Sequence, residues 1–212
     1  MTDQQIEENK QYFQHLCREY IKREGVERLL HYLEHSTDFY TAPSSTSFHL
    51  NERGGLCQHS LNVFDTALRL HRAILKPAIE AGRSNRQETI SDESIAICAL
   101  LHDVCKCNIY HETEKWRKDE HGRWQSYQGY ELVDDFPFGH GEKSCILIHH
   151  YIRLTREELL AIRWHMGAFE MTENGSSGRK SFYNACQSCH LVPLLQAADF
   201  LTAQCLETTI QH

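Results

Sequence analysis

The 212-residue sequence is poor in proline and glycine, with 4 and 11 residues, while 41% of it is hydrophobic. This balance excludes a disordered chain and predicts a globular protein. No run of 18 apolar residues occurs, so we expect no membrane-spanning segment and no membrane partner. Residues 1–8 are polar and acidic and lack the basic and apolar regions of a secretory signal, which predicts a cytoplasmic location.

Positive charge is also scarce. Lysine and arginine number 22 against 29 acidic residues, which gives a formal net charge of −7. A broad nucleic-acid-binding face would be basic, so we do not expect an extended nucleic acid as a partner. A local cationic pocket, in particular one charged by metal ions, is compatible with this balance.

Disulfides are not expected among the nine cysteines, because a cytoplasmic protein keeps its thiols reduced and the count is odd. Cys186-Gln-Ser-Cys189-His190 has the spacing of a c-type haem site, but covalent haem attachment generally requires export. A zinc knuckle would need two more ligands, and Cys105 and Cys107 form the only other close pair. Free thiols packed between helices are therefore the expectation.

Apolar residues at helical spacing predict helices over most of the chain. Between residues 4 and 35 they recur at i, i+3, i+4 and i+7, which indicates amphipathic helices that Gly25 divides into two. Residues 41–55 are rich in Ser, Thr and Gly and predict a loop. Thr155 and Glu158 have the spacing of a capping box. The other predicted helices cover about residues 56–81, 89–103, 139–152, 155–166 and 190–209, the last with Pro193 in its first turn.

Residues 115–127 alternate aromatic and charged side chains about a Glu-His-Gly turn, which predicts a β-hairpin within residues 110–138. One interpretation is a lid or recognition element, in which Trp116 and Trp124 stack on a base. The alternative is a solvated hairpin whose aromatic residues pack on the domain. The cations that would lie near phosphates in the first case are Lys115, Arg117, Lys118 and Arg123.

His102 and Asp103 stand side by side at the end of an apolar run that begins at Ser94. Adjacent helical residues point in different directions, so a core rarely needs both, whereas a metal site can take an imidazole and a carboxylate from one helix end. Further histidines and an aspartate lie near other predicted helix ends, where helices of a bundle can converge. The candidate ligands are His59, His102, Asp103, His140, His165 and Asp199. Such a set suits one or two divalent ions of Fe, Mn, Ni, Co or Zn, and Asp103 can bridge two ions through its two oxygens.

The order of these residues resembles the HD-domain metal-dependent phosphohydrolase superfamily. The matching segments, between about residues 50 and 205, are Gly54-Gly-Leu-Cys-Gln-His59, Ala99-Leu-Leu-His102-Asp103-Val-Cys-Lys106, His140-Gly-Glu-Lys, Trp164-His165 and Ala198-Asp199. The resemblance implies a mainly α fold, an HD-domain helical bundle with a small β-hairpin insertion at about 110–138. Together with the helical and hairpin patterns along the chain, it predicts one HD-type domain over residues 1–212, with residues 1–48 as an amino-terminal helical extension packed on it.

The resemblance also implies roles for these residues. In members that hold two metals, the first ion lies at the positions of His59, His102, Asp103 and Asp199, and the second at those of Asp103, His140 and His165. The implied reaction is hydrolysis of a phosphoester or phosphodiester of a small nucleotide-type substrate by a metal-activated water. Asp103 and Lys106 are the candidate catalytic residues, and similar members carry a lysine at the position of Lys106. The candidate substrate-binding cations are Arg53, Lys143 and Arg163.

Two alternatives stay open at this point, as does the oligomeric state. Some proteins of the same fold that resemble this ligand pattern are mixed-valent diiron oxygenases, which turnover-coupled oxygen consumption would reveal. A non-catalytic module that binds a nucleotide or a metal would instead bind nucleotide tightly without turnover. Lys106 and the other cations near the motifs favour phosphate chemistry.

Overall fold

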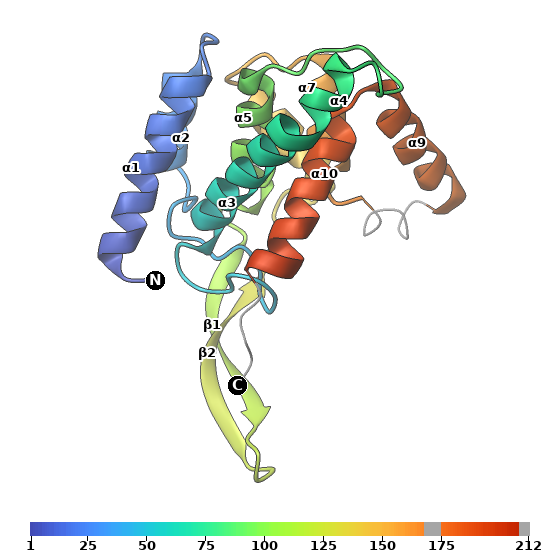
Figure 1. The fold of residues 1–212 in the computed structure, drawn as a ribbon. Coiled ribbons are helices and arrows are strands. Elements are labelled where there is room, and N and C mark those ends of the chain that lie inside the picture. The colour runs from blue at the N-terminus through green and yellow to red at the C-terminus, as the bar shows by residue number, and fades with distance from the viewer. Residues whose placement is uncertain (168–174, 208–212) are drawn as a thin grey trace.

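The computed structural model describes residues 1–167 and 175–207, and it consists of helices with one two-stranded hairpin (Figure 1). The prediction of a mainly α fold with a hairpin insertion is confirmed. In chain order the elements are α1 (Asp3–Tyr20), α2 (Val26–His35), α3 (Gly55–Leu70), a π-helical turn (His71–Leu75), α4 (Lys76–Glu80), α5 (Asp92–Leu101), a 3-10 turn (Val104–Lys106), β1 (Tyr110–Lys118), β2 (Trp124–Leu132), α6 (His140–His149), α7 (Arg156–Trp164), α9 (Gly175–Ser188), α10 (Leu191–Leu201) and a second π-helical turn (Thr202–Leu206).

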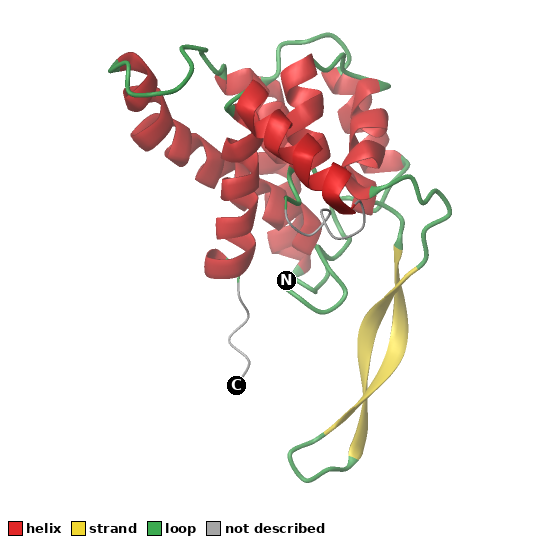
Figure 2. Cartoon of the chain, turned by 90° about the vertical axis from the view of Figure 1, so that its right-hand side faces the viewer, coloured by secondary structure: helices red, strands yellow, loops and turns green. Residues whose placement is uncertain are grey.

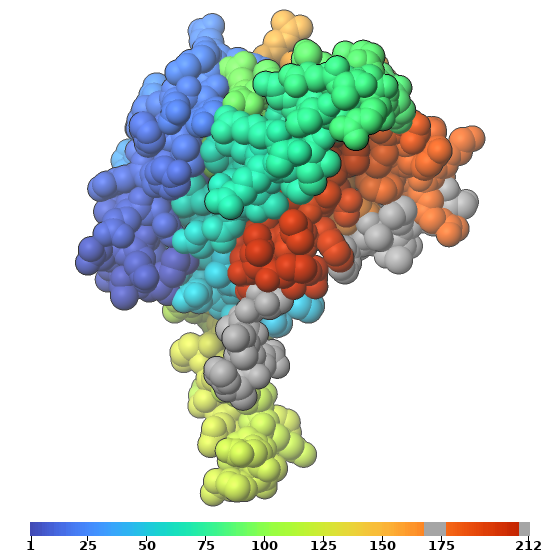
Figure 3. All heavy atoms as spheres, in the orientation of Figure 1, coloured from blue at the N-terminus to red at the C-terminus, as the bar shows by residue number. Residues whose placement is uncertain are grey.

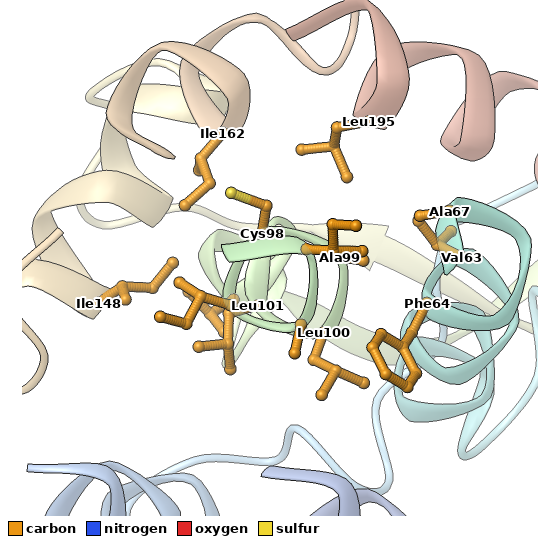
Figure 4. Close-up of a cluster of buried hydrophobic side chains, with 14 of the residues drawn as sticks. Val63, Phe64, Ala67, Cys98, Ala99, Leu100, Leu101, Ile148, Ile162 and Leu195 are labelled. Carbon is orange, nitrogen blue, oxygen red and sulfur yellow. The ribbon is translucent and has the colours of Figure 1, made fainter. Parts of the chain in front are cut away.

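Helix α5 forms the centre of the core. Every residue from Ile95 to Leu101 is buried, as expected for a helix that is apolar on all sides. Figure 4 shows its side chains facing Val63 and Phe64 of α3, Ile148 of α6, Ile162 of α7 and Leu195 of α10. These helices therefore pack around α5, and the candidate site lies just beyond its last residue.

The two amino-terminal helices pack on this core through α1, which contacts α3 and α5 and buries Phe13 and Leu16. The predicted division at Gly25 is confirmed. Gly25 has φ of +99°, a conformation that side chains rarely adopt, and a Cβ atom there would overlap the carbonyl oxygen of Tyr151. A glycine is thus required both for the turn and for its contact with the segment after α6.

The hairpin leaves the helical body as a narrow, twisted projection (Figures 2 and 3). Its strands pair antiparallel, from Tyr110 opposite Leu132 to Lys118 opposite Trp124. The predicted Glu-His-Gly turn is confirmed, because Asp119 accepts hydrogen bonds from the backbone N–H groups of His121 and Arg123 and closes the tip. Trp116 and Trp124 are exposed, so within the described residues they do not pack on the helical body.

The helix ends differ from the prediction in several places. The helix expected over residues 89–103 begins at Asp92 and ends at Leu101, so His102 and Asp103 lie just beyond it. Helix α9 was not predicted. The last predicted helix, 190–209, becomes α10 followed by a π-helical turn, and residues 208–209 lie outside the described residues. None of the helices described is both long and apolar enough to cross a membrane.

Candidate metal centre

The six candidate ligands come from five parts of the chain and meet at one place. His59 lies on α3 and Asp199 on α10, His102 and Asp103 follow the last residue of α5, His140 begins α6 and His165 follows α7. A Cβ atom at Gly141 would overlap the carbonyl oxygen of Arg163, so this glycine allows the start of α6 to approach the end of α7. The approach brings His140 and His165 together, with ring centroids 5.1 Å apart.

The Asp103 carboxylate lies between two sets of histidines and is only 2% exposed. Its Oδ1 lies 2.8 Å from His140 Nε2 and 3.4 Å from His165 Nε2. Its Oδ2 lies 3.5 Å from His102 Nε2 and 3.7 Å from His59 Nε2. Each oxygen therefore faces a different pair of ring nitrogens, which is the arrangement expected of a carboxylate that bridges two ions.

Asp199 completes the first of these sets. Its Oδ1 lies 3.1 Å from His59 Nε2 and 3.9 Å from His102 Nε2. Four overlapping groups of described side chains could each hold an ion, and two of them share Asp103: His59 with His102 and Asp103, and Asp103 with His140 and His165. The other two are His102 with His165 and Asp199, and His49 with His59 and Glu207. The two groups that share Asp103 correspond to the two implied ion positions, except that Asp199 is grouped with His102 and His165 and lies 3.1 Å from His59 Nε2.

Three histidines have a tautomer fixed by what surrounds them. His102 Nδ1 lies 2.9 Å from the carbonyl oxygen of Ala99, and His165 Nδ1 lies 2.6 Å from that of Ile162. His59 Nδ1 lies 2.8 Å from a carboxylate oxygen of Glu207. Because these oxygens can only accept, Nδ1 carries the proton in each ring, and Nε2 of a neutral ring is left with a lone pair that faces the cluster.

The arrangement of lone pairs fits a bound cation. His59 Nε2 and His102 Nε2 are 3.3 Å apart, close to the separation of about 3.3 Å between ligand atoms bound at about 2.0–2.1 Å around a tetrahedral ion. His165 Nε2 is buried and has no hydrogen-bond partner among the described residues. Buried acceptors that face one another are unfavourable unless a proton or a metal ion lies between them.

The charged groups of the cluster lie close enough to shift one another's pKa values. Burial opposes ionisation of Asp103, but the Lys106 ammonium and the neighbouring histidines outweigh it and hold the pKa of this carboxyl well below its usual range. Burial lowers the pKa of His102 to about 4, which keeps the ring neutral. Burial would also lower the pKa of His59, but hydrogen bonds to Asp199 and Glu207 raise it to about 10. Without a metal ion, His59 therefore also carries a proton on Nε2, and a bound cation would take the place of that proton.

Comparison with protein families agrees with this geometry. The family model described as HD domain matches residues 56–204. The chain belongs to the HD domain family. This family is one of metal-dependent phosphohydrolases, and the matched stretch contains all six candidate ligands. Searches of the curated proteins and of the solved structures found no match to the chain.

A cavity of about 370 Å³ opens next to the ligand cluster of this HD domain. Its lining includes four of the candidate ligands, His59, Asp103, His165 and Asp199. The remaining described residues of the lining come from loop 41–54, from the segment after α5, from the segment after α7, and from α10 with its π-helical turn. A small molecule in the cavity would thus lie directly against both groups of ligand atoms.

Of the four predicted cations, the structure brings Lys106 to the cavity. Its Nζ lies 2.7 Å from Asp103 Oδ2, and the residue is buried. Burial alone would lower the pKa of Lys106, but the Asp103 carboxylate outweighs it and raises the pKa. Lys106 therefore stays protonated beside the ligand cluster.

The other three predicted cations are not among the described residues that line the cavity. Each of these side chains pairs with an acidic residue outside the lining: Arg53 with Asp3, Lys143 with Asp134 and Arg163 with Glu142.

Two residues at the site were missed by the sequence interpretation. Glu207 is buried and bonds both His59 and Asn62 Nδ2, the latter at 2.7 Å. His49 lines the cavity with its ring centroid 4.8 Å from that of His59, and its Nε2 is a buried atom without a hydrogen-bond partner in the described chain. Its position five residues before Gly54-Gly is the one signal that could have marked it.

Proposed function

We propose that the protein hydrolyses a phosphoester or phosphodiester of a small, nucleotide-type substrate with the help of two divalent transition-metal ions. The observation that carries the proposal is the Asp103 carboxylate, whose two oxygens face two different pairs of histidine Nε2 atoms. Membership of a family of metal-dependent phosphohydrolases supports the reaction class. The cavity volume lies at the small end of the range for small-molecule sites, about 300–1,000 Å³, which favours a small substrate.

The ligand roles are those that the family resemblance implies, and the groups of ligand atoms that share Asp103 support them. His59, His102, Asp103 and Asp199 would hold the first ion, and Asp103, His140 and His165 the second. When bound, divalent ions of Fe, Mn, Ni, Co or Zn supply the positive charge that activates a water and polarises a phosphate. The buried carbonyl and carboxylate acceptors at Nδ1 keep His59, His102 and His165 oriented for this task.

Lys106 would contact a phosphate oxygen. It is held at the cavity by Asp103, it is protonated, and its ammonium can stabilise the charge that accumulates on phosphate in the transition state. Asp103 and Lys106 are thus the proposed catalytic pair. A role in phosphate binding for Arg53, Lys143 and Arg163 stays a prediction from the sequence, and their ion pairs give it no support.

Asp103→Asn tests the proposal because it keeps the side-chain size and removes the charge shared by both ions. Phosphate release from nucleotides and from a generic phosphodiester is measured with Mn²⁺, Ni²⁺, Fe²⁺, Co²⁺ and Zn²⁺, with oxygen uptake followed in parallel. We expect activity to fall about 100-fold or more. Asp135→Asn changes an exposed carboxylate and is the control. Full activity in Asp103→Asn, or turnover coupled to oxygen uptake without phosphate release, contradicts the proposal.

A further inference from the structure

The cavity beside the ligand cluster contains little positive charge. Lys106 is the one lysine among the described residues that line it, none of these is an arginine, and the Lys106 ammonium is already paired with Asp103. The stretches outside the described residues, 168–174 and 208–212, contain no lysine or arginine in the sequence. Metal ions and Lys106 could therefore balance one phosphate group, but the rest of the described lining has no lysine or arginine for a second or third.

Away from the ligands the lining includes two phenylalanine rings. Phe48 is 77% exposed and Phe200 is 52% exposed, and both line the cavity. The exposure of Phe48 does not come from a loose loop, because the buried hydroxyl of Ser44 donates to the carbonyl oxygen of His49 and the Ser45 hydroxyl accepts from the Phe48 N–H at 2.9 Å. The loop thus holds the apolar Phe48 ring at the cavity, and this ring stays exposed to water unless a ligand binds against it.

Two amides accompany the Phe200 ring. Gln196 and Gln204 lie four residues before and after Phe200, and both line the cavity. The Gln196 side chain packs closely on Gly167, since a Cβ atom added to Gly167 would lie 3.0 Å from Gln196 Cγ and Nε2. An amide offers one acceptor and two donors, which suits the polar edge of an uncharged heterocyclic ring.

We propose that this cavity selects a nucleoside monophosphate: a planar, uncharged base lies against Phe48 and Phe200 within reach of Gln196 and Gln204, and one phosphate lies at Lys106 and the ligand cluster. Nucleoside di- and triphosphates are disfavoured because their additional negative charges would lie among apolar and amide side chains in a protein of net charge −7. The single-phosphate part rests on the proposed function, whereas the base site does not.

Three probes test the base site and the preference for one phosphate separately, because ribose 5-phosphate and ATP each differ from AMP in one feature. Ribose 5-phosphate has no base, AMP has a base and one phosphate, and ATP has a base and three phosphates. In the metal-loaded protein we expect kcat/KM for AMP to exceed that for each of the other two by about tenfold or more. A value for ATP equal to or above that for AMP overturns the preference for one phosphate. A value for ribose 5-phosphate equal to that for AMP overturns the base site.

Adenosine binding tests the base site without any hydrolysis, since adenosine carries no phosphate. We expect Phe200→Ala to raise the Kd of adenosine, measured by calorimetry, about tenfold through loss of stacking. Leu201→Ala is the matched control, because Leu201 is the next residue of α10, is 38% exposed and is absent from the described lining. An unchanged Kd in Phe200→Ala overturns the base site. If no probe is hydrolysed with any metal while Phe200→Ala still weakens adenosine binding, the proposed function fails and the base site stands.

Discussion

The Glu207 carboxylate accepts a hydrogen bond from His59 Nδ1 and so fixes the proton on that nitrogen. Backbone carbonyl oxygens do the same for Nδ1 of His102 and His165. The difference is that a carboxylate is charged and belongs to a side chain, so mutation can remove it. The Asn62 amide, which donates to the other oxygen of Glu207, holds the carboxylate in place. Glu207 is therefore a positioning residue that can be tested without touching a proposed ligand.

Glu207→Ala is expected to weaken metal binding at the His59 side about 10–100-fold, because His59 loses the partner that orients its ring. Glu207→Gln should recover much of the affinity, since an amide oxygen can accept the same hydrogen bond. Metal affinity is measured by competition with a chelator, and Glu80→Ala, which changes an exposed residue at the end of α4, is the control. Equal affinities for Glu207→Ala and the control would show that Glu207 does not position His59.

The sequence interpretation identified the six clustered residues because a metal site needs particular residue types at helix ends, and that requirement is visible in spacing. Glu207 could not be found in this way. It follows Asp199 by eight residues, whereas in a regular α-helix the residue that lies on the same face as Asp199 would be seven residues later. The π-helical turn Thr202–Leu206 adds a residue and so turns Glu207 toward His59, although no spacing rule predicts such a turn.

Among the elements, the link between α1 and α2 fastens the amino-terminal helices to α7. Arg23 in this link makes two hydrogen bonds of 2.6 Å to the carboxylate of Glu158, which is fully buried in the first turn of α7. The same carboxylate accepts from the Thr155 backbone N–H in the capping box of that helix. One buried carboxylate thus joins a helix start to a link more than 100 residues away in sequence.

Arg23→Met is expected to lower the free energy of unfolding by about 2–4 kcal/mol, because it leaves the buried Glu158 charge without its partner. Arg18→Met removes an exposed pair with Glu27 and should cost about 0–1 kcal/mol. Both values come from chemical denaturation followed by circular dichroism. Similar losses for the two variants would contradict a special role of the Arg23–Glu158 pair.

Most elements could be predicted because their signals are local. The Thr155 capping box, the Gly25 division and the hairpin turn depend on a few adjacent residues, and the structure confirms all three. Helix α9 could not be predicted, since its first four residues, two glycines and two serines, are typical of a loop. Its inner face packs on α7 and α10, and such tertiary contacts override weak local propensity.

The match to the family covers residues 56–204 and so leaves out the amino-terminal helices. Helix α1 nevertheless packs directly on α3 and α5, which lie within the matched part or begin at its edge. That residues 1–212 form a single domain stays a prediction. The hairpin inserted between α5 and α6 contributes none of the described residues that line the cavity. The proposed hydrolysis and the proposed base site therefore use residues of the helices and of the loops that join them. The role of the hairpin as a lid stays a prediction.

Metal binding is expected to stabilise the whole helical body, because the proposed ligands join α3, α10 and the ends of α5, α6 and α7. At a free metal concentration of about 100 Kd the gain is about 2.7 kcal/mol, which corresponds to a rise in Tm of about 5–10 °C for a chain of this size. Calorimetry compares the metal-loaded and the chelator-treated protein. In Asp103→Asn the rise should shrink below about 2 °C, whereas Asp135→Asn should retain it. An equal Tm with and without metal would mean that the cluster is no metal centre.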